Sequence, residues 1–371
     1  MSYFLTEEQA LIQKIARDFA QNECKPRAAE IDKTGDYPMD LWKRAAELGF
    51  TGLCIPEEFG GMGADATTEM IVMEELGKQC PTLALNIDAH MYAVASIAKA
   101  GTEEQRKKYV IPTAKGVKIA ALSSTEPTGC TNYDEWTLTA TDKGDHVELN
   151  GTKIFSTNAQ VADIYVVMAN TSDGLIQYIV EKDYPGVETT YIENKLGLSG
   201  SNSGTLTLKK VMVPKENQFV AGALTDVYLP FLDVAAISLG MAEEVFDRTF
   251  AYLMQRTRSF KPLATLGSIP EQLAKMSAEI EFARTFIYSA ARLYDEGRGE
   301  PKLHFMAKAV VCEMAVKIIS RCMELHGAVG YSEDAGIARY LRDAQGFLVA
   351  EASTAVHWYL VALMMGIPMP Y

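Results

Sequence analysis

Residues 136–151 read WTLTATDKGDHVELNG, and they mark the point where the sequence changes from a helical to an extended pattern. Trp136 to Ala140 and His146 to Leu149 are short segments rich in β-branched and aromatic residues, which favour strands. The Asp-Lys-Gly-Asp run between them and the Asn150-Gly151 pair after them are typical of turns. The stretch therefore predicts antiparallel strands separated by turns.

Further strand-like segments follow in the same part of the chain, with Pro185-Gly186 as another turn signal. Together they predict an antiparallel β domain of about a hundred residues, which we place at residues 120–225. The additional predicted strands are Ile164 to Met168, Gln177 to Val180 and Thr205 to Leu208.

Helical patterns precede and follow this β domain. Thr6-Glu7-Glu8-Gln9 resembles a capping box, and apolar residues from Leu11 to Phe19 fall on one helical face. We expect a helical domain at residues 1–119 and a helical bundle at 226–371 that could also supply an oligomer interface. The further predicted helices are Met39 to Leu48, Thr67 to Leu76, Ala89 to Lys99, Ala235 to Gln255, Ile269 to Tyr294 and Lys302 to Leu325.

The composition limits the class of protein. With 371 residues, the chain has the size of an enzyme. Its net charge of −13 disfavours nonspecific binding to nucleic acid or to anionic membranes. Its N-terminus lacks the pattern of a signal or transit peptide, and no apolar run is long enough to span a membrane. The six cysteines are scattered without CxxC pairs, so we expect free thiols, no metal site and a cytoplasmic location.

Several motifs occur in a fixed order along the chain. STEPTGCTN at 124–132 is similar to the motif TEPGAGSD, and LNGTKIFSTN at 149–158 is similar to LNGxKxWITN. Lys195 to Ser203, Val211 to Pro214 and the Arg342-Asp343 pair follow in matching order. On these motifs, which span nearly the whole chain, the sequence resembles the acyl-CoA dehydrogenase superfamily.

The resemblance implies an α+β multidomain fold with an N-terminal α-helical domain, a central antiparallel β-barrel and a C-terminal four-helix bundle. It also implies a homotetramer with FAD between domains and subunits. The implied activity is removal of hydrogen from carbons α and β of an acyl-CoA thioester, or the reverse enoyl-CoA reduction. The implied electron partner is an electron-transferring flavoprotein.

This chemistry needs a base for the α proton and an acceptor for the β hydride, and the acceptor must be a cofactor. In the family the base is usually a Glu nine residues beyond the Arg of an Arg-Asp pair, and counting from Arg342 reaches Glu351. Burial would raise the pKa of such a carboxylate toward that of the α proton. The family reads Tyr-Glu-Gly-Thr here, whereas this chain has Ala350 and Ala352 around the Glu. The alternative is a Glu that favours the start of the last helix through the helix dipole.

The resemblance also implies FAD contacts. Thr125 and Thr157 would bond the flavin ring, Phe155 would stack on it in place of a Trp, and Thr131 would lie near phosphate. The alternative for these residues is ordinary strand chemistry, and for the bundle residues ordinary turns and caps. The remaining implied contacts are Arg256 at the pyrophosphate, Glu324, Gly327 and Gly330 at the adenylate of a neighbouring subunit, and Ser353.

The substrate side departs from the family pattern. Phe231 occupies the position of an Arg that the family uses toward coenzyme A, which weakens the expected grip on that group. Asp88 and His90 lie in the segment that lines the acyl pocket in the family, so they are candidates for recognising a polar acyl group. The alternative is a cap or a solvated residue.

Three functions stay open at this point. The first is the FAD-dependent dehydrogenase or reductase described above. The second is a diverged member that acts on a cyclic, carboxylated or carrier-protein-bound acyl thioester, which the missing Arg favours. The third is a flavin-poor subunit that completes the site of a related partner in a hetero-oligomer.

Overall fold

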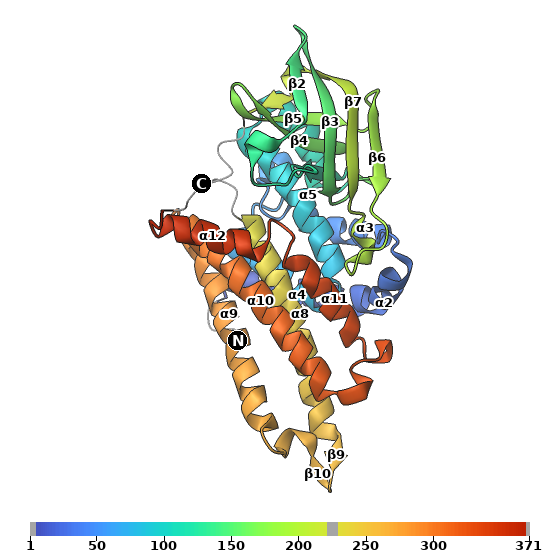
Figure 1. The fold of residues 1–371 in the computed structure, drawn as a ribbon, viewed down its shortest axis with the longest axis vertical. Helices are drawn as coiled ribbons and strands as arrows, with labels where there is room; N and C mark the ends of the chain where they lie inside the picture. Colours follow the sequence, from blue (N-terminus) through green and yellow to red (C-terminus); the bar gives the residue numbers. More distant parts are fainter. Residues whose placement is uncertain (1–4, 221–228, 369–371) are drawn as a thin grey trace.

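The computed structural model describes residues 5–220 and 229–368. Figure 1 shows a helical part formed by the first third of the chain, a sheet part beside it, and long C-terminal helices that extend away from the sheets. The three-part order expected from the sequence is thus confirmed. The boundary predicted between residues 225 and 226 lies outside the described residues.

The N-terminal helices form as the apolar periodicity predicts. The capping box is present, since the Thr6 hydroxyl accepts a hydrogen bond from Gln9 N and the Gln9 side chain accepts one from Thr6 N. Helices α4 and α5 are buried along most of their length and form the centre of this part. The helices are α1 (Glu7–Phe19), α2 (Lys25–Thr34), α3 (Met39–Glu47), α4 (Ala66–Gln79), α5 (Pro81–Ala100), α6 (Glu103–Gln105) and α7 (Ile111–Ala114).

The middle part consists of two four-stranded sheets with strand orders β1-β4-β5-β8 and β2-β3-β7-β6. The described strands pair only within their own sheet, so the expected closed barrel is corrected to two sheets. The expectation of purely antiparallel pairing is corrected as well, because β1 runs parallel to β4. The strands are β1 (Ala120–Ser123), β2 (Thr139–Asp142), β3 (His146–Ser156), β4 (Ile164–Thr171), β5 (Gly174–Glu181), β6 (Val187–Tyr191), β7 (Gly204–Pro214) and β8 (Gln218–Phe219).

The C-terminal part is built on three long helices that pack on one another, with two shorter helices packed on α10. A small hairpin of β9 (Thr257–Arg258) and β10 (Lys261–Pro262) lies at the far tip of the bundle, away from the sheets (Figure 1). The helices are α8 (Leu229–Gln255), α9 (Ile269–Asp295), α10 (Pro301–Leu325), α11 (Ile337–Phe347) and α12 (Thr354–Met364).

Helix α4 packs closely on α8 and so joins the N-terminal part to the bundle. A Cβ on Gly240 would lie 2.1 Å from the carbonyl oxygen of Glu74, and one on Gly77 would lie 2.5 Å from that of Ile237. The two glycines therefore permit backbone contact between the helices, which a side chain at either position would block.

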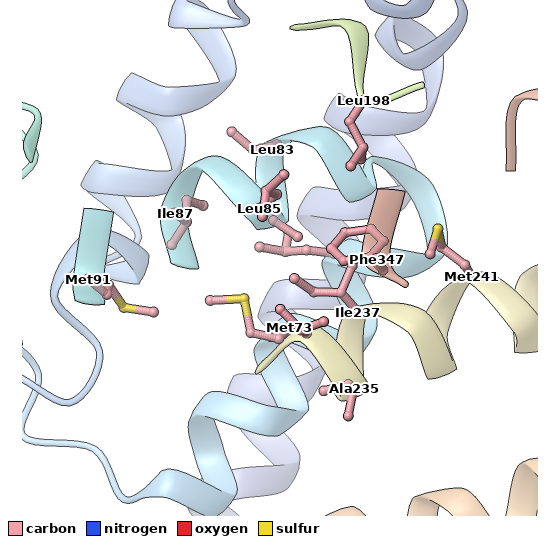
Figure 2. Close-up of a cluster of buried hydrophobic side chains, with 14 of the residues drawn as sticks. Met73, Leu83, Leu85, Ile87, Met91, Leu198, Ala235, Ile237, Met241 and Phe347 are labelled. Carbon is pink, nitrogen blue, oxygen red and sulfur yellow. The ribbon is translucent and has the colours of Figure 1, made fainter. Parts of the chain in front are cut away.

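A continuous apolar core crosses the junction of all three parts. Figure 2 shows Met73 from α4, Ile237 from α8, Phe347 from α11 and Leu198 from the middle part gathered around side chains of α5. This shared core fixes the positions of the loops that carry the candidate site. Among the described residues, no helix is both long enough and apolar enough to cross a membrane.

Candidate active site

Glu351 lies in the turn between α11 and α12, and several contacts hold this turn in place. The Lys308 ammonium donates hydrogen bonds to the carbonyl oxygens of Leu348 and Ala352, at 3.3 and 2.6 Å. Nε2 of His357 lies 2.8 Å from the carbonyl oxygen of Glu351. Ser353 accepts a hydrogen bond from Val356 N and caps α12. The backbone that carries the Glu351 carboxylate is therefore fixed from three sides.

The surroundings of Glu351 suit proton transfer. Its side chain is half-buried, and desolvation raises the pKa of its carboxyl group, while the positive charge of Lys308 acts in the opposite direction. A carboxylate with a raised pKa is a stronger base toward a weakly acidic C–H group. The role of Glu351 as the base stays a prediction, which its raised pKa supports.

The turn adopts left-handed backbone conformations at two successive residues that are not glycine. Glu351 has φ of 49° and Ala352 has φ of 67°. An L-residue in this region costs about 1 to 2 kcal/mol relative to its usual conformations. The resemblance places Gly at position 352, so this chain carries strain next to its candidate base.

We expect Ala352→Gly to raise the free energy of unfolding by about 1 kcal/mol, because glycine adopts this φ without steric strain. Urea unfolding of both proteins measures the difference. Ala350→Gly is the matched control: Ala350 has no positive φ, so glycine there is expected to lower stability. Equal effects of the two substitutions would contradict the assignment of strain to position 352.

The Arg-Asp pair from which Glu351 was counted is anchored to the middle part. Asp343 accepts a hydrogen bond of 2.6 Å from Leu198 N, and Arg342 pairs with Asp32 and Glu333. The backbone of Gly197 lies so close to Arg342 that a Cβ would come within 2.6 Å of its carbonyl oxygen. The Lys-x-Gly motif and the Arg-Asp pair are thus in direct contact.

The end of β3 presents an exposed aromatic ring. Phe155 is 62% exposed and has φ of 56°, and Ile154 N donates a 2.8 Å hydrogen bond to Thr125 O. Thr157 is half-buried two residues farther on, and the Ser156 hydroxyl donates to Ser123 on β1. The structure therefore brings Thr125, Phe155 and Thr157 to one edge of the sheets.

The loop after Thr125 lies within electrostatic range of Glu351. Burial raises the pKa of the Cys130 thiol, and the negative charge of Glu351 raises it further. Thr131, the predicted phosphate contact, is exposed on the same loop. The charge of Glu351 thus reaches the loop that carries Thr131.

A buried ion pair holds this loop against β3. Lys153 Nζ lies 2.9 Å from a carboxylate oxygen of Glu126 and 2.9 Å from Ser124 O, and both charged side chains are fully buried. Glu126 also accepts hydrogen bonds from the backbone of Thr137 and Leu138. The Lys153 ammonium lies 3.6 Å from the centre of the Trp136 ring. Sequence reasoning missed this pair, although both residues lie inside the quoted motifs.

The predicted FAD contacts of the bundle lie elsewhere in the chain. Arg256 is exposed between α8 and the hairpin, and Glu324 is exposed and paired with Arg321. Gly327 has φ of 63° with open space around it, whereas a Cβ on Gly330 would lie 2.3 Å from Met323 O. Figure 1 places the tip far from the turn between α11 and α12. The FAD contacts expected of these residues, including those of the Gly327 to Gly330 loop to a neighbouring subunit, stay predictions.

The three candidate substrate residues have different surroundings. Asp88 is fully buried on α5, and Phe231 on α8 packs against Phe305 and His357, with ring centres 5.3 and 4.9 Å apart. Phe231 therefore supports the helix that follows Glu351, and its ring gives no grip on an anionic group. Its place on the substrate side stays a prediction.

The surroundings of His90 correct its expected role in binding substrate. Its Nε2 lies 3.1 Å from Thr113 O, its Nδ1 accepts a 2.9 Å hydrogen bond from Ala120 N, and its ring lies edge-on to Trp42. Both ring nitrogens are occupied by backbone groups, so His90 joins α5 to β1 and has no nitrogen left for a substrate.

This burial predicts a pH effect on stability. Desolvation lowers the pKa of His90 from 6.5 to about 4, so the folded protein keeps the ring neutral while the unfolded chain takes up a proton. The contribution of His90 is complete above pH 6.5 and is lost as the pH falls toward 4, at about 1.4 kcal/mol per unit. His90→Gln should therefore cost less stability at pH 5 than at pH 7 in urea unfolding. An equal cost at both pH values would contradict the neutral ring.

Two further carboxyl groups near the site were not singled out as acidic partners from the sequence. Asp233 on α8 and Glu69 on α4 are buried and line a pocket together with Tyr92 of α5. The pocket has a cavity volume of about 70 Å³ and is partly open to solvent.

The fold and this site together define an oxidoreductase that acts on CH–CH groups. The chain matches the family models for the acyl-CoA dehydrogenase N-terminal domain at residues 6–117, the middle domain at 121–211 and the C-terminal domain at 232–365. The chain belongs to the acyl-CoA dehydrogenase family.

Individual relatives agree with this assignment. The chain is 35% identical to a short-chain-specific acyl-CoA dehydrogenase of Clostridium acetobutylicum, over 98% of this chain and 99% of the relative. It is 30% identical to the caffeyl-CoA reductase-Etf complex subunit CarC of Acetobacterium woodii, over 98% and 99%. The butyryl-CoA dehydrogenase structure from Megasphaera elsdenii superposes with a TM-score of 0.93 at 31% identity, over 98% and 100%.

Proposed function

We propose that this protein catalyses the FAD-dependent α,β-dehydrogenation of an acyl-CoA thioester, or the reverse enoyl-CoA reduction, with Glu351 as the base that takes the α proton. The observation that carries the proposal is the fixed turn of Glu351, whose carboxyl group has a raised pKa and whose charge acts on Cys130 in the loop that follows Thr125.

The residues at that edge fit a flavin ring. Phe155 offers an exposed aromatic face, and the adjacent Thr125 and Thr157 supply hydroxyl and backbone groups for hydrogen bonds to ring heteroatoms. FAD, when bound, supplies the two-electron acceptor that protein side chains lack. Arg256, Thr131 and the Gly327 turn would hold its phosphate and adenylate groups, with those of the bundle coming from a neighbouring chain in a homotetramer.

The chain's own part in the reaction is proton transfer and orientation. Glu351 accepts the α proton of the thioester and holds it as a neutral carboxyl group, which its desolvated position favours. Lys308 and His357 keep the turn in one conformation by binding its carbonyl oxygens. The reverse reduction would use the same carboxyl group as the proton donor.

The names of two relatives support proposals for the direction of the reaction and for the electron partner. CarC is named as a subunit of a reductase-Etf complex, which supports an electron-transferring flavoprotein as the partner of this chain. The same name supports reduction of an enoyl thioester beside the dehydrogenation of the Clostridium relative.

Anaerobic titration of the purified protein tests the proposal. We expect a yellow protein whose flavin absorbance is bleached by acyl-CoA thioesters, and whose reduced form is reoxidised by enoyl-CoA thioesters. Colourless protein that gains FAD only when a related subunit is co-expressed would contradict the proposal and support the noncatalytic subunit of a hetero-oligomer.

A further inference from the structure

Two acidic side chains from different helices lie buried beside the candidate base. Asp88 on α5 is 1% exposed and Asp233 on α8 is 2% exposed. Both oxygens of Asp88 and Oδ1 of Asp233 are buried and accept no hydrogen bond from an N–H or hydroxyl group of the described residues. The two carboxyl groups interact with each other through a shared proton, which occupies one oxygen of each. Buried carboxyl oxygens normally have partners, because their desolvation is otherwise uncompensated. The oxygens that the shared proton does not occupy are therefore available to a ligand.

The pair belongs to the same electrostatic region as Glu351. Desolvation and then the negative charge of Glu351 raise the pKa of Asp88 well above its usual value. Desolvation and the charges of Glu69 and Asp88 do the same for Asp233. Asp233 and Glu69, which is 3% exposed, both line the pocket. Two carboxyl groups thus line the pocket, and the charge of Glu351 acts on both Asp88 and Asp233.

The described positive charges nearby are already engaged. Lys308 binds the carbonyl oxygens of the Glu351 turn. Lys99 lines the pocket about 16 Å along α5 from Asp88 and has an interaction of its own. Neither ammonium group forms an ion pair with Asp88 or Asp233. The missing counter-charge is therefore expected from the substrate.

We propose that the acyl group of the substrate carries a positively charged nitrogen, which binds to the carboxyl groups of Asp88, Asp233 and Glu69. This proposal rests on the function proposed above and specifies its substrate class. A carboxylated acyl group would bring a further carboxyl group into this acidic region and is disfavoured. A hydroxyl group could satisfy one oxygen only, whereas an ammonium group bonds several carboxylate oxygens and also attracts the face of Tyr92 in the same pocket.

Pairs of thioesters with matched shapes test the proposal on the FAD-loaded wild-type protein. One pair is 5-aminopentanoyl-CoA and hexanoyl-CoA, and the other is 4-trimethylammoniobutanoyl-CoA and 5,5-dimethylhexanoyl-CoA. We expect kcat/KM to be at least about tenfold higher for the charged member of one pair or both. Equal values, or preference for the neutral members or for 5-hydroxypentanoyl-CoA, would overturn the proposal.

Variants of the two aspartates test whether these residues cause the preference for charged thioesters. Asp88→Asn and Asp233→Asn should each reduce the preference for the charged thioester by about tenfold, with less effect on the neutral one. Asp247→Asn, an exposed position on α8, is the matched control and should keep the preference. Unchanged preference in both pocket variants would also overturn the proposal, and the wild-type comparison decides it if either variant fails to fold.

The outcomes separate this proposal from the function on which it rests. Bleaching by neutral thioesters alone would leave the dehydrogenase function intact and reject the charged substrate. Absence of bleaching by every thioester, charged or neutral, in protein that contains FAD would reject the function itself.

Discussion

Glu351→Gln is expected to abolish the bleaching of flavin by substrate while leaving FAD bound. The amide has nearly the shape of the carboxyl group but cannot accept the α proton, so kcat should fall by roughly 10² to 10⁴-fold. Binding of FAD should persist because the turn is held through backbone carbonyl groups, which the substitution keeps. Absorbance spectra during anaerobic titration give both results from one sample.

Two controls make this result specific. Glu271→Gln removes an exposed carboxylate of α9 that pairs with Lys275, and it should bleach as the wild type does. Full bleaching by Glu351→Gln would reject Glu351 as the base. Asp88, whose pKa is raised partly by the charge of Glu351, would then become the candidate.

Lys153→Met is expected to lower the free energy of unfolding by about 3 to 5 kcal/mol, because it leaves the buried Glu126 carboxylate without its counter-charge. The same change should weaken FAD binding, since the pair fixes the loop that runs from Thr125 to Thr131. Urea unfolding and the flavin content after gel filtration measure the two effects.

The double variant and a surface pair complete the experiment. Glu126→Gln combined with Lys153→Met should cost less than the sum of the single changes, because neither variant then buries a lone charge. Lys215→Met breaks the exposed pair with Asp142 in the same domain and should cost at most about 1 kcal/mol. If Lys153→Met lowered the free energy of unfolding by no more than Lys215→Met does, the buried pair would not be essential for stability.

The sequence predicted the long elements well. The helices at 39–47 and 269–295 and the strand at 164–171 lie where apolar periodicity placed them. The sheet arrangement could not be predicted, because β1 is a four-residue strand, Ala120–Ser123, with no turn signal of its own, and its parallel partner lies more than forty residues away. The spacing of strands along a chain does not distinguish two open sheets from a closed barrel.

A site residue could be predicted where its position follows from its spacing to a motif in the sequence. It could not be predicted where its role follows from contacts between residues far apart in the chain. Glu351 was found from its spacing to Arg342 in the sequence. Its role stays a prediction until Glu351→Gln is measured. Lys308 and Asp233 escaped notice because their meaning depends on Glu351 and Asp88, which lie far from them in sequence. His90 was misassigned because only the fold reveals that Thr113 and Ala120 occupy both ring nitrogens.

The stacked arrangement of Lys153 on Trp136 gives the protein an intrinsic optical reporter. The chain has three tryptophans, and Trp136 is the one whose indole donates to Gly129 O, at 3.0 Å, inside the loop that bears Thr125 and Thr131. A change in that loop alters both the charge above the indole and its hydrogen bond. The emission of Trp136, read with Trp42 and Trp358 replaced by Phe, would therefore follow the ordering of the loop in real time without any added dye.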